Sequence, residues 1–274
     1  MERGICRLCL KPADLRDSHY IPRRAYSMNM AKALKNPNPI VISHGQIKQV
    51  SDQLRGHTFC QECEQLLSKK GEKWVLANIP NDQGRPFPLQ DALIPENPVF
   101  LGDGINLYAG RKIKAFDMDQ LIHFGMSMFW RGAAREWKSS LGEIAPPVNL
   151  GDYYEPIRQF LLGGQFPDGV VILVYVYNLK PAMNAATTVL SAKNKMAEFR
   201  WFYLNGLGFE LYLGKEIPKQ IRQLCAYRSS DGFVMVDREF GRMVRHSLKE
   251  NLTSHAWSGK LQDFLKGPDP RKKA

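Results

Sequence analysis

The sequence predicts an α+β protein: a small metal-stapled module at the N-terminus, followed by a larger α+β domain with an antiparallel sheet. Two Cys-x-x-Cys pairs, Cys6/Cys9 and Cys60/Cys63, flank strand and helix signals in the first part. In the second part a strongly amphipathic segment precedes a series of β-branched and aromatic runs. Helices and strands that are grouped in this way, rather than alternating regularly, are typical of the α+β class.

The N-terminal segment begins with the first cysteine pair and then predicts alternating short elements. Pro22 suits the first turn of a helix, and the "NPNP" run at 36–39 ends that helix. Leu66, Leu67 and Val75 are spaced as in a helix that leaves the second cysteine pair. We therefore expect strands over 15–21, 40–50 and 53–59, and helices over 22–34 and 61–78.

A proline-rich segment separates the two parts. Residues 80–98 hold five prolines and little hydrophobic periodicity, which is typical of a linker. The sequence therefore predicts a module over 1–79, a linker over 80–98 and an α+β domain of unassigned role over 99–274.

The second part opens with its clearest helix signal. Residues 117–137 carry apolar residues on one helical face, from Ile122 to Trp137. The "GLG" at 206–208, between two strand-like runs, favours a hairpin turn over a phosphate loop. We further expect helices over 154–162, 218–227 and 238–249, and strands over 170–177, 187–192, 199–204, 209–213 and 232–236.

Composition and charge restrict the class of protein. The 274 residues are 44% hydrophobic, which is enough to build a real core, yet no apolar run reaches the length of a membrane span. The first residues do not resemble a secretory signal, so a cytoplasmic protein is expected. The formal net charge of +11 favours a nucleic acid or another polyanion as partner. Residues 1–80 carry 13 Lys and Arg against 7 Asp and Glu, so the charge is densest there.

The four paired cysteines predict a structural zinc site. In a reducing compartment, two Cys-x-x-Cys pairs indicate tetrathiolate zinc more readily than disulfides, and iron is the alternative metal. A four-thiolate site is closed, so its zinc would stabilise the fold rather than bind substrate. Cys225 has the spacing of an apolar helix residue and is expected to be buried.

One motif is left over by a structural zinc. "SHYIP" at 18–22 places His19 three residues before Pro22, between the two cysteine pairs. Together with Cys6-x-x-Cys9 and "CQEC" at 60–63, this resembles the HNH, or ββα-metal, endonucleases that carry a four-cysteine zinc. The resemblance covers roughly residues 1–78, and the whole chain more weakly resembles an uncharacterised bacterial HNH-like group. It implies a hairpin and helix in which His19 is the general base, and a nucleic-acid partner that is DNA rather than RNA.

Phosphodiester hydrolysis also needs a divalent cation and groups that grip phosphate. The resemblance implies Mg²⁺ or Mn²⁺ as catalytic cofactor, and Arg23 and Arg24 follow His19 as phosphate-binding candidates. Where the family has a ligand after the last cysteine pair, this chain has Glu64, and Glu72 recurs on the same helical face. Where the family has a ligand just before the base, this chain has Ser18. Asp17 is the substitute, because residues i and i+2 of a strand share a face; His44 and His57 are further candidates.

Two other functions stay open. The chain could be a non-catalytic zinc-ribbon module that binds nucleic acid or protein and has lost the second metal, as Ser18 suggests. It could also be an adaptor that uses residues 99–274 to contact a protein partner or a second copy of itself. If these residues have only structural roles, His19 is a core histidine, while Glu64, Glu72, Arg23 and Arg24 are surface charges.

Overall fold

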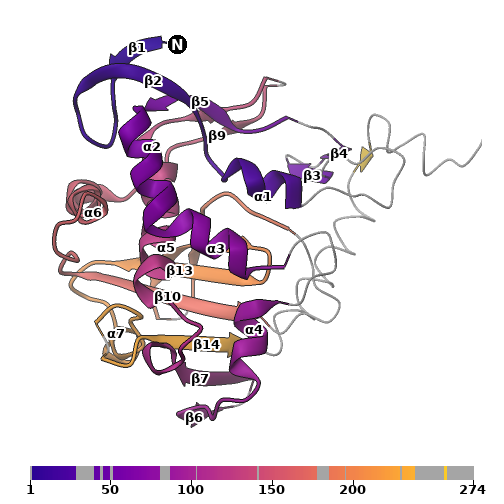
Figure 1. The fold of residues 1–274 in the computed structure, drawn as a ribbon, viewed down its shortest axis with the longest axis vertical. Helices are drawn as coiled ribbons and strands as arrows, with labels where there is room; N and C mark the ends of the chain where they lie inside the picture. The colour runs from indigo at the N-terminus through magenta and orange to yellow at the C-terminus, as the bar shows by residue number, and fades with distance from the viewer. Residues whose placement is uncertain are drawn as a thin grey trace, which may run out of the picture.

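The computed structural model describes most of the chain. The described residues are 2–28, 40–43, 46–49, 52–80, 87–102, 104–140, 142–177, 185–194, 196–228, 230–237 and 256–257. The structure is a mixed α+β fold, as predicted, in which two main sheets lie at opposite ends of the molecule with helices between them (Figure 1).

The N-terminal sheet contains strands from both parts of the sequence. Its order is β1-β2-β5-β8-β9, and all its pairs are antiparallel. The last two strands come from beyond the proline-rich segment, and Arg55 of β5 pairs with Lys138 of β8. The N-terminal sheet is therefore completed by the second part of the chain. Its strands are β1 (Glu2–Ile5), β2 (Pro12–His19), β5 (Arg55–Phe59), β8 (Trp137–Lys138) and β9 (Ile144–Ala145).

The helix expected over 61–78 is present and is confirmed. It is not uniform, because α2 (Gln61–Leu67) and α3 (Lys73–Asn78) are joined by a π-helical turn, η1 (Ser68–Glu72). Within that turn, a side chain at Gly71 would place its Cβ 2.5 Å from the carbonyl oxygen of Gln120. Glycine therefore lets this helix approach α5 (Met118–Ala134) closely.

The other elements expected before residue 60 are also found where they are described. The helix that follows β2 is α1 (Arg23–Met28). A small third sheet contains β3 (Ile40–Ser43), β4 (Gln46–Gln49) and β15 (Ala256–Trp257), in the order β15-β4-β3. The remainder of the expected helix, at 29–34, lies outside the described residues.

The larger sheet is mixed, which corrects the expectation of an antiparallel one. Its order is β11-β12-β13-β10-β14-β7-β6, and β10 pairs with β14 in parallel. The parallel pair arises because β14 inserts between β10 and β7, two strands that lie earlier in the chain. The strands are β6 (Phe100–Leu101), β7 (Ile105–Ala109), β10 (Val170–Tyr177), β11 (Leu190–Lys193), β12 (Glu198–Leu204), β13 (Leu207–Leu213) and β14 (Phe233–Asp237).

The hairpin predicted at 206–208 is confirmed, one residue earlier than expected. β12 and β13 are joined by Asn205 and Gly206, which both have positive φ, at 42° and 90°. Two positive φ angles at the central positions match the twist of a tight antiparallel hairpin, and Asn and Gly tolerate them best.

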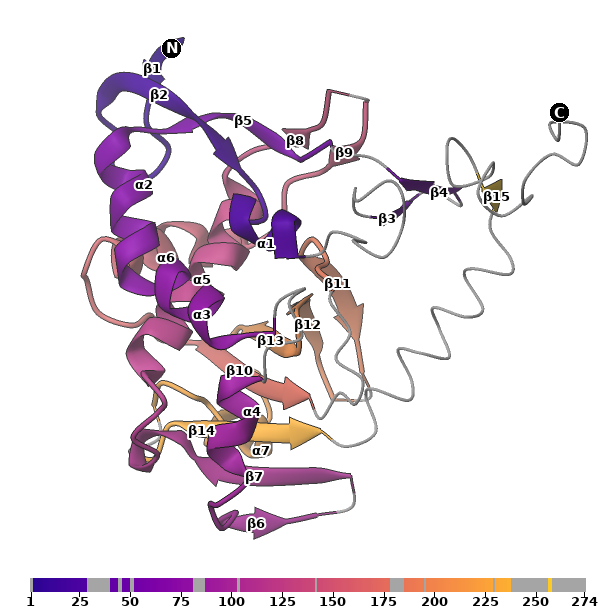
Figure 2. The same ribbon diagram turned by 45° about the vertical axis from the view of Figure 1, so that its right-hand side comes forward.

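Helix α5 is the centre of the fold. It lies between the two main sheets (Figure 2) and is buried along nearly its whole length. At Gly125 it comes so close to the larger sheet that an added Cβ would lie 2.6 Å from the ring of Phe209. One continuous hydrophobic core extends from Cys6 through α5 to Val236. The two sheets therefore share their packing.

The remaining helices lie around this core. They are α4 (Pro88–Leu93), α6 (Tyr154–Leu161) and α7 (Lys219–Gln223). Helix α4 falls inside the segment predicted as a linker, and its Leu89 and Leu93 are buried. Cys225 is fully buried, as expected. The helix expected at 238–249 and residues 81–86 lie outside the described residues.

Candidate functional site

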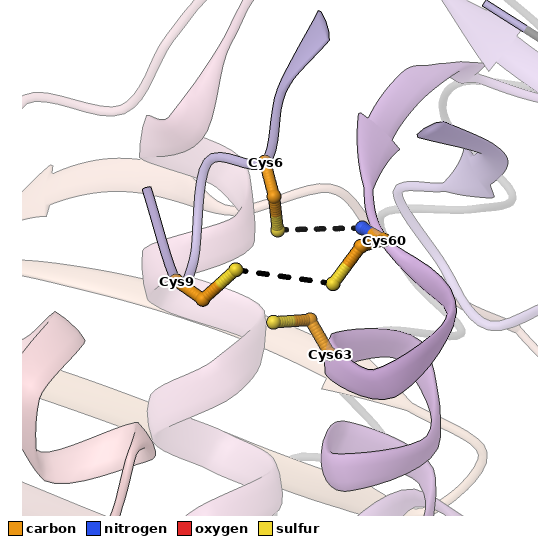
Figure 3. A group of neighbouring side chains, drawn as sticks. All are labelled: Cys6, Cys9, Cys60 and Cys63. Atoms are coloured by element: carbon orange, nitrogen blue, oxygen red, sulfur yellow. Dashed lines mark hydrogen bonds between the residues drawn. The ribbon is translucent and has the colours of Figure 1, made fainter. Parts of the chain in front are cut away.

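The four paired cysteines meet at one point (Figure 3). Cys6 and Cys9 lie in the turn after β1, and Cys60 and Cys63 lie at the start of α2. Their Sγ atoms are within 4.8 Å of one another, and the Cys9 and Cys60 sulfurs are 3.9 Å apart. Zinc bound tetrahedrally with bonds of about 2.3 Å holds its thiolates at comparable separations. This cluster could hold a metal ion such as zinc.

Hydrogen bonds prepare the cluster for a cation. A hydrogen bond from Cys63, supported by backbone amides, lowers the pKa of the Cys6 thiol to about 4. The backbone N–H of Cys60 donates to Cys6 Sγ at 3.3 Å. Conversely, the hydrogen bond to Cys6 raises the pKa of Cys63, and burial raises that of Cys60 to about 11. The Cys6 thiolate thus forms readily, whereas Cys60 and Cys63 would release their protons to a bound cation.

His19 is the last residue of β2, at the end of the strand that is farther from the Cys6–Cys9 turn. β2 and β5 are antiparallel, with His19 opposite Arg55 and a register shift between Arg16 and Asp17. Helix α2 follows β5 after one residue and packs against β2. His19 therefore ends the first strand of a strand-strand-helix unit, and the paired cysteines join its elements.

The environment of His19 favours the neutral imidazole. Burial lowers the pKa of His19 below its usual value, and the nearby charges partly cancel. Asp17 and Glu64 raise it, whereas Arg23 and Arg55 lower it. A neutral imidazole at pH 7 can accept a proton, as a general base must. Asp17 and Glu64, the two carboxylates predicted as metal ligands, therefore both lie within electrostatic reach of His19.

Glu64 carries an unsatisfied oxygen. Its Oε1 is buried and has no hydrogen-bond partner among the described residues. A buried carboxylate oxygen without a donor is destabilising, by about 1–3 kcal/mol or more for a charged group, so it demands an explanation. A cation beside this oxygen would supply the missing partner, and carboxylate oxygens are ligands that hard divalent cations accept.

Asp17 and Ser18 differ in the way that strand geometry predicts. Asp17 is exposed on the face of His19, and its carboxylate accepts from Arg55 at 2.9 Å. Ser18 is 2% exposed; its hydroxyl accepts from the Phe59 amide and donates to the Arg16 carbonyl oxygen. Ser18 thus serves the hairpin. The ion pair with Arg55 uses Asp17 Oδ2, so any cation bound by Asp17 would share its carboxylate with Arg55.

The other predicted residues divide into two groups. Arg23 and Arg24 are exposed at the start of α1, and neither forms an ion pair with the described residues. Arg23 is close enough to act on the pKa of His19. Glu72 and His57 already have charged partners: Glu72 pairs with Arg131 at 3.3 Å and His57 Nδ1 lies 3.1 Å from a Glu2 oxygen. His44 lies outside the described residues.

Three arginines from the second part of the chain, none of them predicted as site residues, donate hydrogen bonds to backbone carbonyls of the strand-strand-helix unit and the first cysteine turn. Arg158 of α6 donates to the carbonyl oxygen of Leu8, between the first two cysteines. Arg135 donates to the carbonyl oxygen of His57 at 3.1 Å, and Arg131 to those of His19 and Tyr20 at 3.2 and 3.3 Å. The available signal was Arg131 and Arg158 inside otherwise apolar helix faces, which indicates buried partners.

Two observations bear on identity. None of the helices in the described part of the chain is long and apolar enough to cross a membrane. Comparison of the chain with protein-family models, with curated proteins and with solved structures finds no match.

Proposed function

We propose that this protein is a metal-dependent endonuclease of the HNH kind, which hydrolyses phosphodiester bonds in DNA with His19 as general base. The observation that supports the proposal is that the Glu64 carboxylate, whose Oε1 is buried without a partner among the described residues, lies within electrostatic reach of His19 in a strand-strand-helix unit. The paired cysteines, holding structural zinc, would fix the two elements on which these residues lie.

Each residue has a defined task in this proposal. The neutral His19 ring accepts the proton of the attacking water. Arg23 and Arg24 hold phosphates on either side of the scissile bond, because they are exposed and make no ion pair with described residues. Glu64 would hold the divalent cation, Mg²⁺ or Mn²⁺, which supplies positive charge to the phosphorane-like transition state when bound. The positive charge of this segment favours a nucleic-acid substrate, and the resemblance to the HNH endonucleases favours DNA over RNA.

The test compares purified wild type with His19→Ala for nicking of supercoiled plasmid in Mn²⁺, with and without chelator. Loss of a general base should lower the rate by about 10²- to 10⁴-fold while zinc content and melting temperature stay unchanged. His57→Gln is the parallel variant, because His57 lies on the neighbouring strand and faces Glu2 instead. Equal cleavage by wild type and His19→Ala would remove the proposal, and loss with His57→Gln alone would move the base to His57.

Ser18 favours a second candidate function. Its side chain is buried and occupied by Phe59, so the position before His19 offers no metal ligand. The nearest substitute, Asp17, is ion-paired with Arg55. If the second cation does not bind, the same positively charged scaffold would act as a non-catalytic module that binds nucleic acid or a protein partner. Salt-sensitive DNA binding without cleavage, in any divalent metal, would favour this alternative.

A further inference from the structure

We infer that Arg131 is a positioning residue which sets the separation between His19 and Glu64. The inference rests on the proposed function, since it assigns a residue from the second part of the chain to the geometry of the same site. Arg131 does not touch the reacting groups themselves. It acts through the two elements that carry them.

The hydrogen bonds of Arg131 connect the strand to the helix. Nη1 of its guanidinium donates to the carbonyl oxygens of His19 and Tyr20, at 3.2 and 3.3 Å, which fixes the end of β2. Nη2 donates to Glu72 Oε2 at 3.3 Å, which fixes the helix that begins with α2 and carries Glu64 eight residues earlier. One rigid, planar group thus spans both elements.

Arg131 is itself held firmly. It is 3% exposed, and its guanidinium lies 6.0 Å from the centre of the Phe59 ring, at the end of β5. The indole N–H of Trp137 donates to its backbone carbonyl oxygen at 2.9 Å. A buried arginine has few rotamers available, so its three hydrogen bonds transmit the position of α5 to its partners.

The backbone around Glu72 is built for this contact. Glu72 ends the π-helical turn η1, and the adjacent Gly71 lets this turn touch α5 at Gln120 and Phe124. π-helical turns occur mostly as local insertions and frequently at functional sites. The insertion alters the helical phase between Glu64 and Glu72, so the two carboxylates face different surroundings: Glu72 pairs with Arg131, whereas Glu64 Oε1 has no partner in the described part of the chain.

The test is a double-mutant cycle between Arg131→Gln and Glu72→Ala, read as kcat and KM for plasmid nicking. We call the ion pair of Arg131 with Glu72, together with its bonds to the end of β2, the brace. If the two residues act as this one brace, each single change lowers kcat by about 10²-fold with KM nearly unchanged, as expected when a catalytic group is displaced by about 1 Å. The double variant should be no slower than the slower single one, because the brace is already broken. Arg131→Lys should retain an intermediate kcat, since an ammonium can serve only part of the acceptors.

Arg135→Gln is the matched control. Arg135 follows the same helix and also donates to a backbone carbonyl, that of His57 on the neighbouring strand, yet it contacts neither His19 nor Glu72. It should keep kcat within about threefold. Equal losses for Arg135→Gln and Arg131→Gln, or additive losses in the double variant, would overturn the inference.

A second readout keeps the inference separate from the nuclease proposal. With histidine labelled in the ring, the NMR signals of His19 should shift in Arg131→Gln and in Glu72→Ala but not in Arg135→Gln, whereas those of His123 should stay in place. If wild type cleaves no DNA while the His19 signals shift in this pattern, the nuclease proposal fails and the brace stands. Unchanged His19 signals in both brace variants would refute the brace, whatever the activity.

Discussion

Arg158 donates a hydrogen bond to the carbonyl oxygen of Leu8, which lies inside the first Cys-x-x-Cys turn. The arginine comes from α6, 150 positions further along the chain, and its side chain is 7% exposed. Glu155 holds the guanidinium in place through two oxygens, and that pairing lowers the pKa of Glu155 to about 2. A residue from the second part of the chain therefore holds the turn that carries Cys6 and Cys9.

This contact predicts that Arg158→Met weakens metal binding although no ligand is changed. Loss of a hydrogen-bond partner that supports a metal site typically lowers the metal affinity by about 10- to 100-fold. Competition between the protein and a zinc-sensitive chelating dye measures the change, and Arg222→Met, an exposed arginine on α7, is the control. Equal zinc affinity of wild type and Arg158→Met would show that the turn is held without α6.

The cysteine cluster predicts about one zinc ion per chain. Cys60→Ser should lose the zinc and most of the cooperative melting of the N-terminal sheet, because structural zinc contributes directly to folding free energy. Cys225→Ala should keep the zinc, since Cys225 is buried in the core away from the cluster. Metal analysis and calorimetry of both variants check the prediction. A metal-free wild type with an unchanged melting profile would contradict it.

The burial of His19 predicts a pH dependence of cleavage. Its pKa is lowered, so the neutral base form should persist as the pH falls through the usual histidine value of about 6.5. The rate should therefore be level above that value and decline only at lower pH. The profile of kcat/KM measured in Mn²⁺ reports this ionisation in the free enzyme. A decline with its midpoint above about 6.5 would assign the limiting proton to another group.

The extension of the N-terminal sheet by β8 predicts that residues 1–80 do not fold alone. That fragment lacks β8 and the three arginines at 131, 135 and 158, which satisfy four backbone carbonyls of the N-terminal unit. With zinc added, it should show no cooperative thermal transition by circular dichroism. A sharp transition, together with rapid proteolysis of the full chain within 80–98, would instead support the division into two domains.

The sequence predicted the local features well and the long-range ones poorly. Cysteine spacing, the strand before His19 and the helix after Cys63 are encoded within short windows, so the metal cluster and the neighbourhood of His19 and Glu64 could be expected. No short sequence pattern predicts that Arg131 pairs with Glu72, which lies 59 positions earlier in the chain. The pairing of β5 with β8 and the parallel pairing of β10 with β14 are likewise set by packing between distant segments.

Residues 80–98, predicted as a linker, also contain an element that composition does not reveal. Five prolines suggested an irregular segment, but Pro88 takes the first helical position of α4, where a missing N–H is harmless. Leu89 and Leu93 then bury one face of that short helix. Tertiary packing outweighed the composition of the segment.

Glu64→Gln should separate stability from cation binding. Glu64 is half-buried and its Oε1 has no partner among the described residues, so replacing the carboxylate by a neutral amide removes a poorly compensated charge, and the melting temperature without divalent metal should hold or rise. Wild type should be stabilised by Mn²⁺, by about 2.7 kcal/mol at roughly one hundred times the dissociation constant. The variant should gain nothing. Thermal melts with and without Mn²⁺ test this, and equal Mn²⁺ stabilisation of both proteins would exclude Glu64 as a ligand.

The most direct measurement is the broadening of histidine ring signals by Mn²⁺ in zinc-loaded protein. A paramagnetic ion held by Glu64 beside His19 should broaden the His19 signals at low Mn²⁺ concentration and leave those of His123, buried on α5, sharp. In Glu64→Gln the His19 signals should stay sharp at the same concentration. Unbroadened His19 signals in wild type, or equal broadening in wild type and Glu64→Gln, would contradict the account of His19 and Glu64 as one metal-dependent site.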